Sequence, residues 1–132
     1  MRKVLMFLTA VIAGAGVAGA AQDRWDKAEQ AYTKALAGKV AGKPVDCIDT
    51  RRGNVSLSAY RDKLVYTVDR KLVYVNQTTG GCESVARGDT LVTRQFQTRA
   101  CRGDIAQTVS LPPRIPTGSC ALGSFTPYRA AK

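Results

Sequence analysis

Between Asn54 and Asn76, apolar side chains recur at about every second position in three short runs. β-branched and aromatic residues are frequent in these runs, which favours strands over a helix. The runs are separated by Arg61-Asp62-Lys63 and Asp69-Arg70, and connections this short join only antiparallel neighbours. The segment is therefore predicted to be a three-stranded antiparallel meander, which must pack against further strands or a helix to be stable.

Further strands are predicted on both sides of the meander. They lie at Val45–Ile48, Thr90–Phe96, Ile105–Leu111 and, as a last strand, within Ser119–Tyr128. The predicted fold class is mainly β: a small antiparallel barrel or sandwich of about six strands. This β-domain is predicted to occupy residues 45–128, with a short tail at 129–132.

A helical pattern precedes the β-domain. Apolar side chains are spaced three and four apart at Trp25, Ala28, Tyr32, Ala35 and Leu36. The spacing predicts an amphipathic helix over residues 23–37, with acidic residues early and a lysine late, as the helix dipole prefers. Gly38 is suited to the C-cap, and Ala41-Gly42-Lys43-Pro44 is predicted to be a linker. The pattern leaves open whether the helix docks on the β-domain.

The first 20 residues have the organisation of a secretory signal peptide. Arg2 and Lys3 precede an apolar run from Val4 to Ala13, and small residues follow up to Ala20. The apolar run is shorter than the roughly 20 residues that a membrane span needs. We therefore expect cleavage near Ala20, export to the periplasm or the medium, and no integral membrane span in the mature chain.

Four cysteines, Cys47, Cys82, Cys101 and Cys120, are an even number in a chain with an export signal, and they predict two disulfides. Their wide spacing and the lack of histidine argue against a zinc site, so neither a metal nor another cofactor is expected. Three pairings are possible. The hairpin-sized separation of Cys82 and Cys101 favours that pair, which leaves Cys47 with Cys120.

The chain is strongly basic, with 20 lysines and arginines against 10 acidic residues and a net charge of +10. A surplus of this size favours contact with polyanions such as nucleic acid, lipid head groups or acidic glycans. Arg51-Arg52 and Arg70-Lys71 are the only adjacent basic pairs beyond the signal peptide. Because the charges are scattered rather than clustered, they favour a solvated surface that only maintains solubility.

Catalytic chemistry is restricted because the chain contains no histidine. A Ser-His-Asp or Cys-His arrangement is therefore excluded, and so is an HExxH metal site. Glu29 and Glu83 are the only glutamates. A carboxylate pair would need aspartates, for which the candidates are Asp46, Asp49, Asp62 and Asp104. Asp62, like Asp69, lies in a predicted turn, where aspartates commonly bind backbone N–H groups. The sequence brings no two of the other aspartates together, so it predicts a protein that is not an enzyme.

Several short motifs have both a functional and a structural interpretation. Arg102-Gly103-Asp104 is predicted to be a turn in which the glycine has a positive φ and the aspartate accepts backbone hydrogen bonds. Asn54 and Asn76 begin sequons for N-glycosylation. Four aromatic residues are candidates for stacking on bases or sugars, or for packing in the core: Tyr60, Tyr66, Tyr74 and Phe96.

One spaced pattern resembles a known group of proteins. It consists of Cys47-Ile48, Tyr74-Val75-Asn76, Cys82, Cys101-Arg102-Gly103-Asp104 and Cys120-Ala121-Leu122-Gly123-Ser124-Phe125. The pattern resembles small exported proteobacterial proteins classed as a domain of unknown function, and the resemblance covers roughly residues 45–128. It implies export and a compact, cysteine-tied domain, with no assigned activity and no catalytic residue to carry over.

The predicted function is therefore that of an exported, non-enzymatic β-domain of unknown function that binds a component of the cell envelope or serves another role there. Three alternatives stay open. A polyanion-binding protein would lose affinity steeply with salt. An inhibitor of a secreted enzyme would present a rigid, protruding loop. An aspartate-dependent hydrolase would bring Asp46, Asp49 and Asp104 together in one cleft.

Overall fold

The computed structural model describes residues 18–94 and 98–132. Residues 1–17 of the predicted signal peptide lie outside the described residues, as does Phe96. Helix α1 spans Ala18–Leu36, so it begins three residues before the expected cleavage point and ends one residue before the predicted end. Gly38 follows the helix with a φ of +67°, as expected for its C-cap.

The described residues are mainly β, as predicted, and contain ten strands and one short 3₁₀ helix, η1. The strands are β1 (Lys39–Ala41), β2 (Cys47–Asp49), β3 (Ser56–Tyr60), β4 (Lys63–Thr67), β5 (Leu72–Gln77), β6 (Thr90–Thr93), β7 (Arg99–Cys101), β8 (Ile105–Ser110), β9 (Ile115–Ala121) and β10 (Phe125–Ala130), and η1 is Glu83–Arg87. The predicted number of about six is too low. β1 and β7, with three residues each, are too short for alternation to reveal, and the predicted last strand within Ser119–Tyr128 is divided between β9 and β10.

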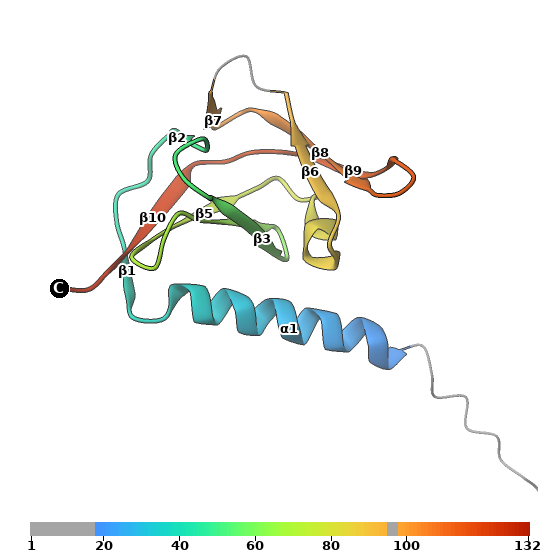
Figure 1. Ribbon diagram of the computed structural model, residues 1–132, viewed down its shortest axis with the longest axis horizontal. Coiled ribbons are helices and arrows are strands. Elements are labelled where there is room, and N and C mark those ends of the chain that lie inside the picture. Colours follow the sequence, from blue (N-terminus) through green and yellow to red (C-terminus); the bar gives the residue numbers. More distant parts are fainter. Residues whose placement is uncertain (1–17, 95–97) are drawn as a thin grey trace, which may run out of the picture.

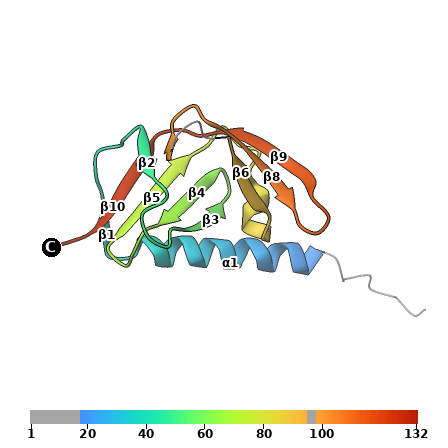
Figure 2. The same ribbon diagram turned by 45° about the horizontal axis from the view of Figure 1, so that its top comes forward.

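The strands form three antiparallel sheets that do not close into a barrel, so the fold is a sandwich (Figure 1). The largest sheet has the order β1-β10-β5-β4-β3, a second has the order β6-β8-β9, and β2 pairs with β7. The predicted meander is confirmed as β3, β4 and β5. Helix α1 lies along one side of this β-structure in both ribbon views (Figure 2).

The segment before residue 45 folds together with the β-domain. Tyr32 of α1 stacks on Tyr60 of β3, with ring centroids 5.1 Å apart, so the helix docks on the meander. The sequence did not predict β1, Lys39–Ala41, which pairs with the end of β10 and includes Ala41, the first residue of the predicted linker. The predicted tail is likewise shortened, since Arg129 and Ala130 belong to β10.

The core lies where the meander meets the β2–β7 pair and the β9–β10 connection. Phe125 is completely buried and packs edge-on against Tyr66, with ring centroids 5.6 Å apart. Leu64, Ala106 and Leu122 are buried in the same cluster. Tyr66 is therefore a core residue rather than a stacking platform. Tyr74, half-buried, packs against the same cluster.

Tyr66 leads to a prediction for alkaline pH. Burial, and then the negative charge of Asp104, raise the pKa of Tyr66 from 10.0 to about 12. Because the unfolded state ionises first, the contribution of the neutral Tyr66 is complete below about pH 10 and is lost between about pH 10 and 12. Two pKa units correspond to roughly 3 kcal/mol. We expect Tyr66→Phe to unfold in urea with a smaller loss of stability between about pH 9.5 and 11.5 than the wild type. An equal loss in both proteins would contradict the assignment.

Both disulfides form, but the predicted pairing is wrong. Cys47 is bonded to Cys101 and Cys82 to Cys120, and the described chain holds no free cysteine. Cys47 and Cys101 face each other directly in the register of β2 and β7, with Cα atoms 4.0 Å apart. Cys82 immediately precedes η1, which packs on β9, where Cys120 lies. The two loops interleave because pairing follows strand register rather than separation along the sequence.

Candidate binding groove

Two of the three aspartates considered for a catalytic cleft, Asp49 and Asp104, have carboxylates in local contacts. Asp49 accepts a hydrogen bond from the Arg51 N–H at 3.0 Å and forms an ion pair with Arg52 at 3.4 Å. The carboxylate of Asp104 accepts the Cys101 N–H at 2.8 Å, as predicted for this turn, and Gly103 has a φ of +89°. The β2–β7 register places Asp46 beside the Cys47–Cys101 bridge and Asp49 at the opposite end of the pair. The structure therefore gives Asp49 and Asp104 structural roles.

Neither a metal centre nor a glycan on Asn76 has support. Residues 18–94 and 98–132 contain no group of three or more cysteine or acidic side chains that could hold a metal ion. The side chain of Asn76 is completely buried, so its sequon is inaccessible in the folded protein, whereas Asn54 is exposed. Of the three described aromatic candidates, Tyr60 borders a hollow in the surface.

This hollow is a groove of about 360 Å³ between α1 and the turn that joins β3 to β4. The residues that line it are Gln22, Trp25, Asp26, Glu29, Tyr60 and Arg61. Trp25 is the only tryptophan of the chain and is 39% exposed. Ligand sites combine aromatic or apolar surface with a few polar groups, and this groove has both kinds of lining, with polar side chains in the majority.

Arg61 forms one wall of the groove in a backbone conformation that arginine rarely adopts. Its φ is +54°, in the left-handed region, and it is the only non-glycine residue with a positive φ among the described residues. Such a conformation costs on the order of 1 kcal/mol. The Cζ atom lies 5.4 Å from the centroid of the Tyr60 ring, and Nε donates a hydrogen bond to the Tyr60 hydroxyl at 3.1 Å. Tyr60 therefore contacts both Tyr32 of α1 and Arg61 of its own turn.

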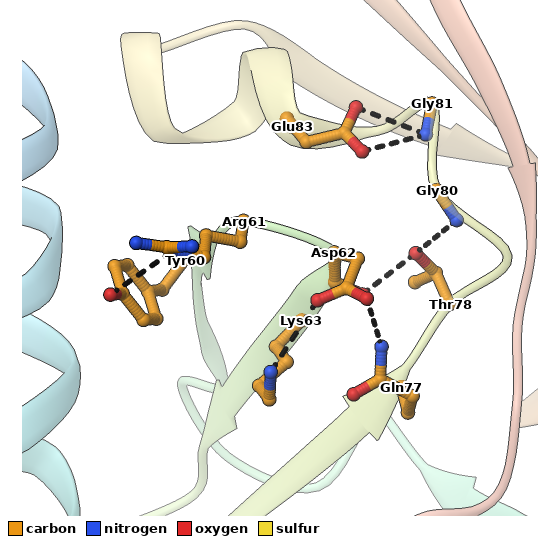
Figure 3. Close-up of polar contacts among 9 residues, drawn as sticks. All are labelled: Tyr60, Arg61, Asp62, Lys63, Gln77, Thr78, Gly80, Gly81 and Glu83. Atoms are coloured by element: carbon orange, nitrogen blue, oxygen red, sulfur yellow. Dashed lines mark hydrogen bonds and ion pairs between the residues drawn. The ribbon is translucent and has the colours of Figure 1, made fainter.

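A hydrogen-bond network keeps the strained turn in place (Figure 3). The Asp62 carbonyl accepts bonds from the Thr78 N–H at 2.9 Å and from its hydroxyl at 2.8 Å. The Asp62 carboxylate accepts a bond from the Gln77 amide and pairs with Lys63 at 3.4 Å. The network continues through the Gly80 N–H, which donates to the Thr78 hydroxyl at 3.1 Å. The connection after β5 thus fixes the position from which Arg61 projects.

The carboxylate of Asp62 is stabilised in its charged form. Partial burial opposes this, but the backbone hydrogen bond at Asp62, the charge of Lys63 and the Gln77 amide together lower the pKa of Asp62. Its contribution to stability is therefore present above the unfolded pKa and is lost as the pH falls through the folded pKa. At neutral pH the Asp62 carboxylate is therefore charged and stabilises the turn.

The opposite wall of the groove is acidic. Gln22, Asp26 and Glu29 follow one another at spacings of four and three along α1, so they share one face of the helix. The groove thus offers an indole, a phenol with a guanidinium over its ring, two carboxylates and an amide. These groups can stack on the flat apolar face of a ligand, and they can donate and accept hydrogen bonds around the edge of that ligand.

Sequence reasoning found Trp25 and Tyr60 separately but did not join them, and it missed Arg61. The helix periodicity places Trp25 on the apolar face, and the strand alternation places Tyr60 at the end of β3. Their proximity depends on how α1 docks on the meander, which neither pattern encodes. The available signal for Arg61 was its position in a two-residue hairpin connection, where the first residue usually needs a positive φ.

The chain matches no protein-family model, no curated protein and no solved structure. The two disulfides indicate an oxidising, extracytoplasmic location. In the part of the chain that the structure describes, no helix has both the length and the apolar character needed to cross a membrane.

Proposed function

We propose that this protein is an exported, non-enzymatic domain that binds a glycan of the cell envelope in the groove between α1 and the β3–β4 turn. The signal-peptide pattern of residues 1–20 and the two disulfides support export to the periplasm or the medium. Cleavage near Ala20 leaves all six groove residues in the mature chain.

The observation that carries the proposal is the strained Arg61 stacked on Tyr60 across from Trp25. Strained residues persist where the surrounding structure forces them and are concentrated at binding and active sites. Sugar rings have apolar faces that suit aromatic side chains, and their hydroxyls suit the carboxylates and amide of the α1 wall. Asp26 and Glu29 would repel a polyanion at this position, which favours a neutral or zwitterionic glycan.

Trp25 allows the proposal to be tested without a label, because it is the only tryptophan and it lines the groove. We expect its fluorescence to change saturably when the oxidised mature protein is titrated with chitotetraose, an amino-sugar oligomer. Tyr60→Ala should weaken this binding by about 10-fold or more, since it removes a stacking partner. Tyr74→Phe, away from the groove, is the matched control. The absence of a saturable change with chitotetraose and with soluble cell-wall fragments would overturn the proposal.

Polyanion binding is the second candidate, and a different surface favours it. A hollow of about 510 Å³ at the end of the five-stranded sheet is lined in part by Lys71, Arg129 and Lys132. Asp69 borders the same hollow, but its carboxylate accepts the N–H groups of Lys71 and Leu72 at 2.6 and 2.9 Å. Heparin binding that falls steeply with salt, and that Tyr60→Ala leaves unchanged, would support this candidate in place of the first.

A further inference from the structure

The β8–β9 hairpin projects from the three-stranded sheet, and its tip is exposed (Figure 2). Every residue from Leu111 to Thr117 is exposed. Leu111 and Ile115 are two of the six large exposed hydrophobic side chains among the described residues, at 61% and 51% exposure. Apolar side chains grouped at the end of a projecting element commonly mark a site of protein–protein contact.

The tip is stiff. Pro112 and Pro113 lie in its turn and Pro116 follows in β9, and each proline ring fixes one backbone φ angle. Below the turn, Ser110 pairs with Ile115 and Val109 with Pro116. A loop that is already rigid in the free protein loses little conformational entropy when it binds.

The base of the hairpin is anchored to the rest of the domain. The Thr117 hydroxyl donates to the Thr108 hydroxyl at 2.9 Å and also contacts the Ser84 hydroxyl at 3.2 Å. Gly118 is in close contact with the backbone of Gly81, where a Cβ atom would overlap the Gly81 carbonyl oxygen. The Cys82–Cys120 disulfide joins the same two segments covalently. The chain on the C-terminal side of the tip is therefore held in place independently of the turn.

Arg114 is the charged group of the tip. It is exposed, is preceded by Pro113 and is followed by Ile115 at the start of β9. Two ion pairs occur among the described residues, Arg52 with Asp49 and Lys63 with Asp62, so Arg114 takes part in neither. β9 is an edge strand of its sheet, so part of its backbone is open to pairing with an extended segment of another protein.

From these features we infer that the hairpin tip binds in the substrate cleft of a trypsin-like serine protease and inhibits it. Arg114 would enter the specificity pocket, whose floor carries a carboxylate in proteases that select basic side chains. Leu111 and Ile115 would contact the apolar rim of the cleft, and the edge of β9 would add backbone pairing. The loop is stiff, and its base is held by the Thr108–Thr117 hydrogen bond and the Cys82–Cys120 disulfide. It would therefore stay bound in the cleft without being cleaved and released by the protease. This inference is independent of the glycan groove, which lies between α1 and the β3–β4 turn.

The test is inhibition of bovine trypsin by the oxidised mature protein, measured with a chromogenic substrate. We expect an inhibition constant in the micromolar range or below. Arg114→Ala should raise this constant by about 100-fold or more, whereas Arg114→Lys, which keeps the charge, should stay within about 10-fold of the wild type. Arg102→Ala removes an arginine from another exposed turn and should change nothing. Circular dichroism of each variant checks that it is folded.

Three outcomes would overturn the inference. The first is no inhibition by the wild-type protein. The second is equal inhibition by the wild type and by folded Arg114→Ala. The third is rapid cleavage of the Arg114–Ile115 bond, detected by mass spectrometry under reduction, because the loop would then be a substrate. None of these outcomes affects binding of chitotetraose, so the glycan proposal and the protease inference fail separately.

Discussion

Replacing Cys82 and Cys120 together by alanine is expected to lower the free energy of unfolding by about 4 kcal/mol or more. The bridge closes a loop with a sequence separation of 38, and its loss gives the unfolded chain more conformational freedom. Both cysteines are also buried, so their removal leaves space in the core. Since domains of this size are stable by about 5 to 15 kcal/mol, the variant should lose a large part of its stability. Urea unfolding followed by circular dichroism measures the loss.

The second bridge provides the matched control. Cys47 and Cys101 are only half-buried, and the strands they join form three residue pairs. The sequence separation of 54 predicts a similar entropic effect, but a smaller packing loss. The Cys47/Cys101 double variant should therefore be the more stable of the two. A Cys82/Cys120 variant within about 1 kcal/mol of the wild type would contradict the assigned role of that bridge.

Asn76→Ala is expected to cost about 3 kcal/mol, the next largest effect. The side chain of Asn76 is completely buried at the end of β5. Its amide nitrogen donates to the Gly123 carbonyl at 2.7 Å, and its carbonyl oxygen accepts the Gly123 N–H at 2.9 Å. Alanine would leave both backbone groups of Gly123 without these partners. Each unsatisfied buried polar group costs about 1 to 3 kcal/mol.

The adjacent Gln77 is the control for Asn76. It is exposed, and its amide donates to the exposed Asp62 carboxylate. Gln77→Ala should therefore change the free energy of unfolding by less than about 1 kcal/mol. Equal effects of Asn76→Ala and Gln77→Ala in urea unfolding would show that the Asn76–Gly123 contact is not a main connection between β5 and the β9–β10 turn.

The features that sequence reasoning predicted well are local. The meander follows from alternation between Asn54 and Asn76, and the helix follows from spacings of three and four after Trp25. Gly38 and Gly103 have the positive φ values expected from their places at a helix end and in a turn. Each of these features is determined by a few neighbouring residues, so a single sequence carries enough information for them.

The features that it missed depend on distant contacts. The pairing of Cys47 with Cys101 requires β2 and β7 to be adjacent, and each of these strands has only three residues. β1 could not be predicted between the helix and the linker because its partner, β10, lies at the other end of the chain. The groove likewise joins α1 to a turn more than thirty residues later. The unusual φ of Arg61 does not follow from its residue type, because the β3–β4 hairpin imposes it.

The turn position of Arg61 requires a positive φ, which glycine would adopt without strain, and we propose that arginine occupies it because its side chain serves binding. The most direct test of this central claim is Arg61→Gly, with unfolding in urea and titration of Trp25 fluorescence with chitotetraose measured on the same sample. Glycine accepts a positive φ without strain, so stability should be unchanged or higher by up to about 1 kcal/mol. Affinity should fall by about 10-fold. A variant that loses stability while its affinity stays at the wild-type value would contradict the account, because Arg61 would then serve the fold alone.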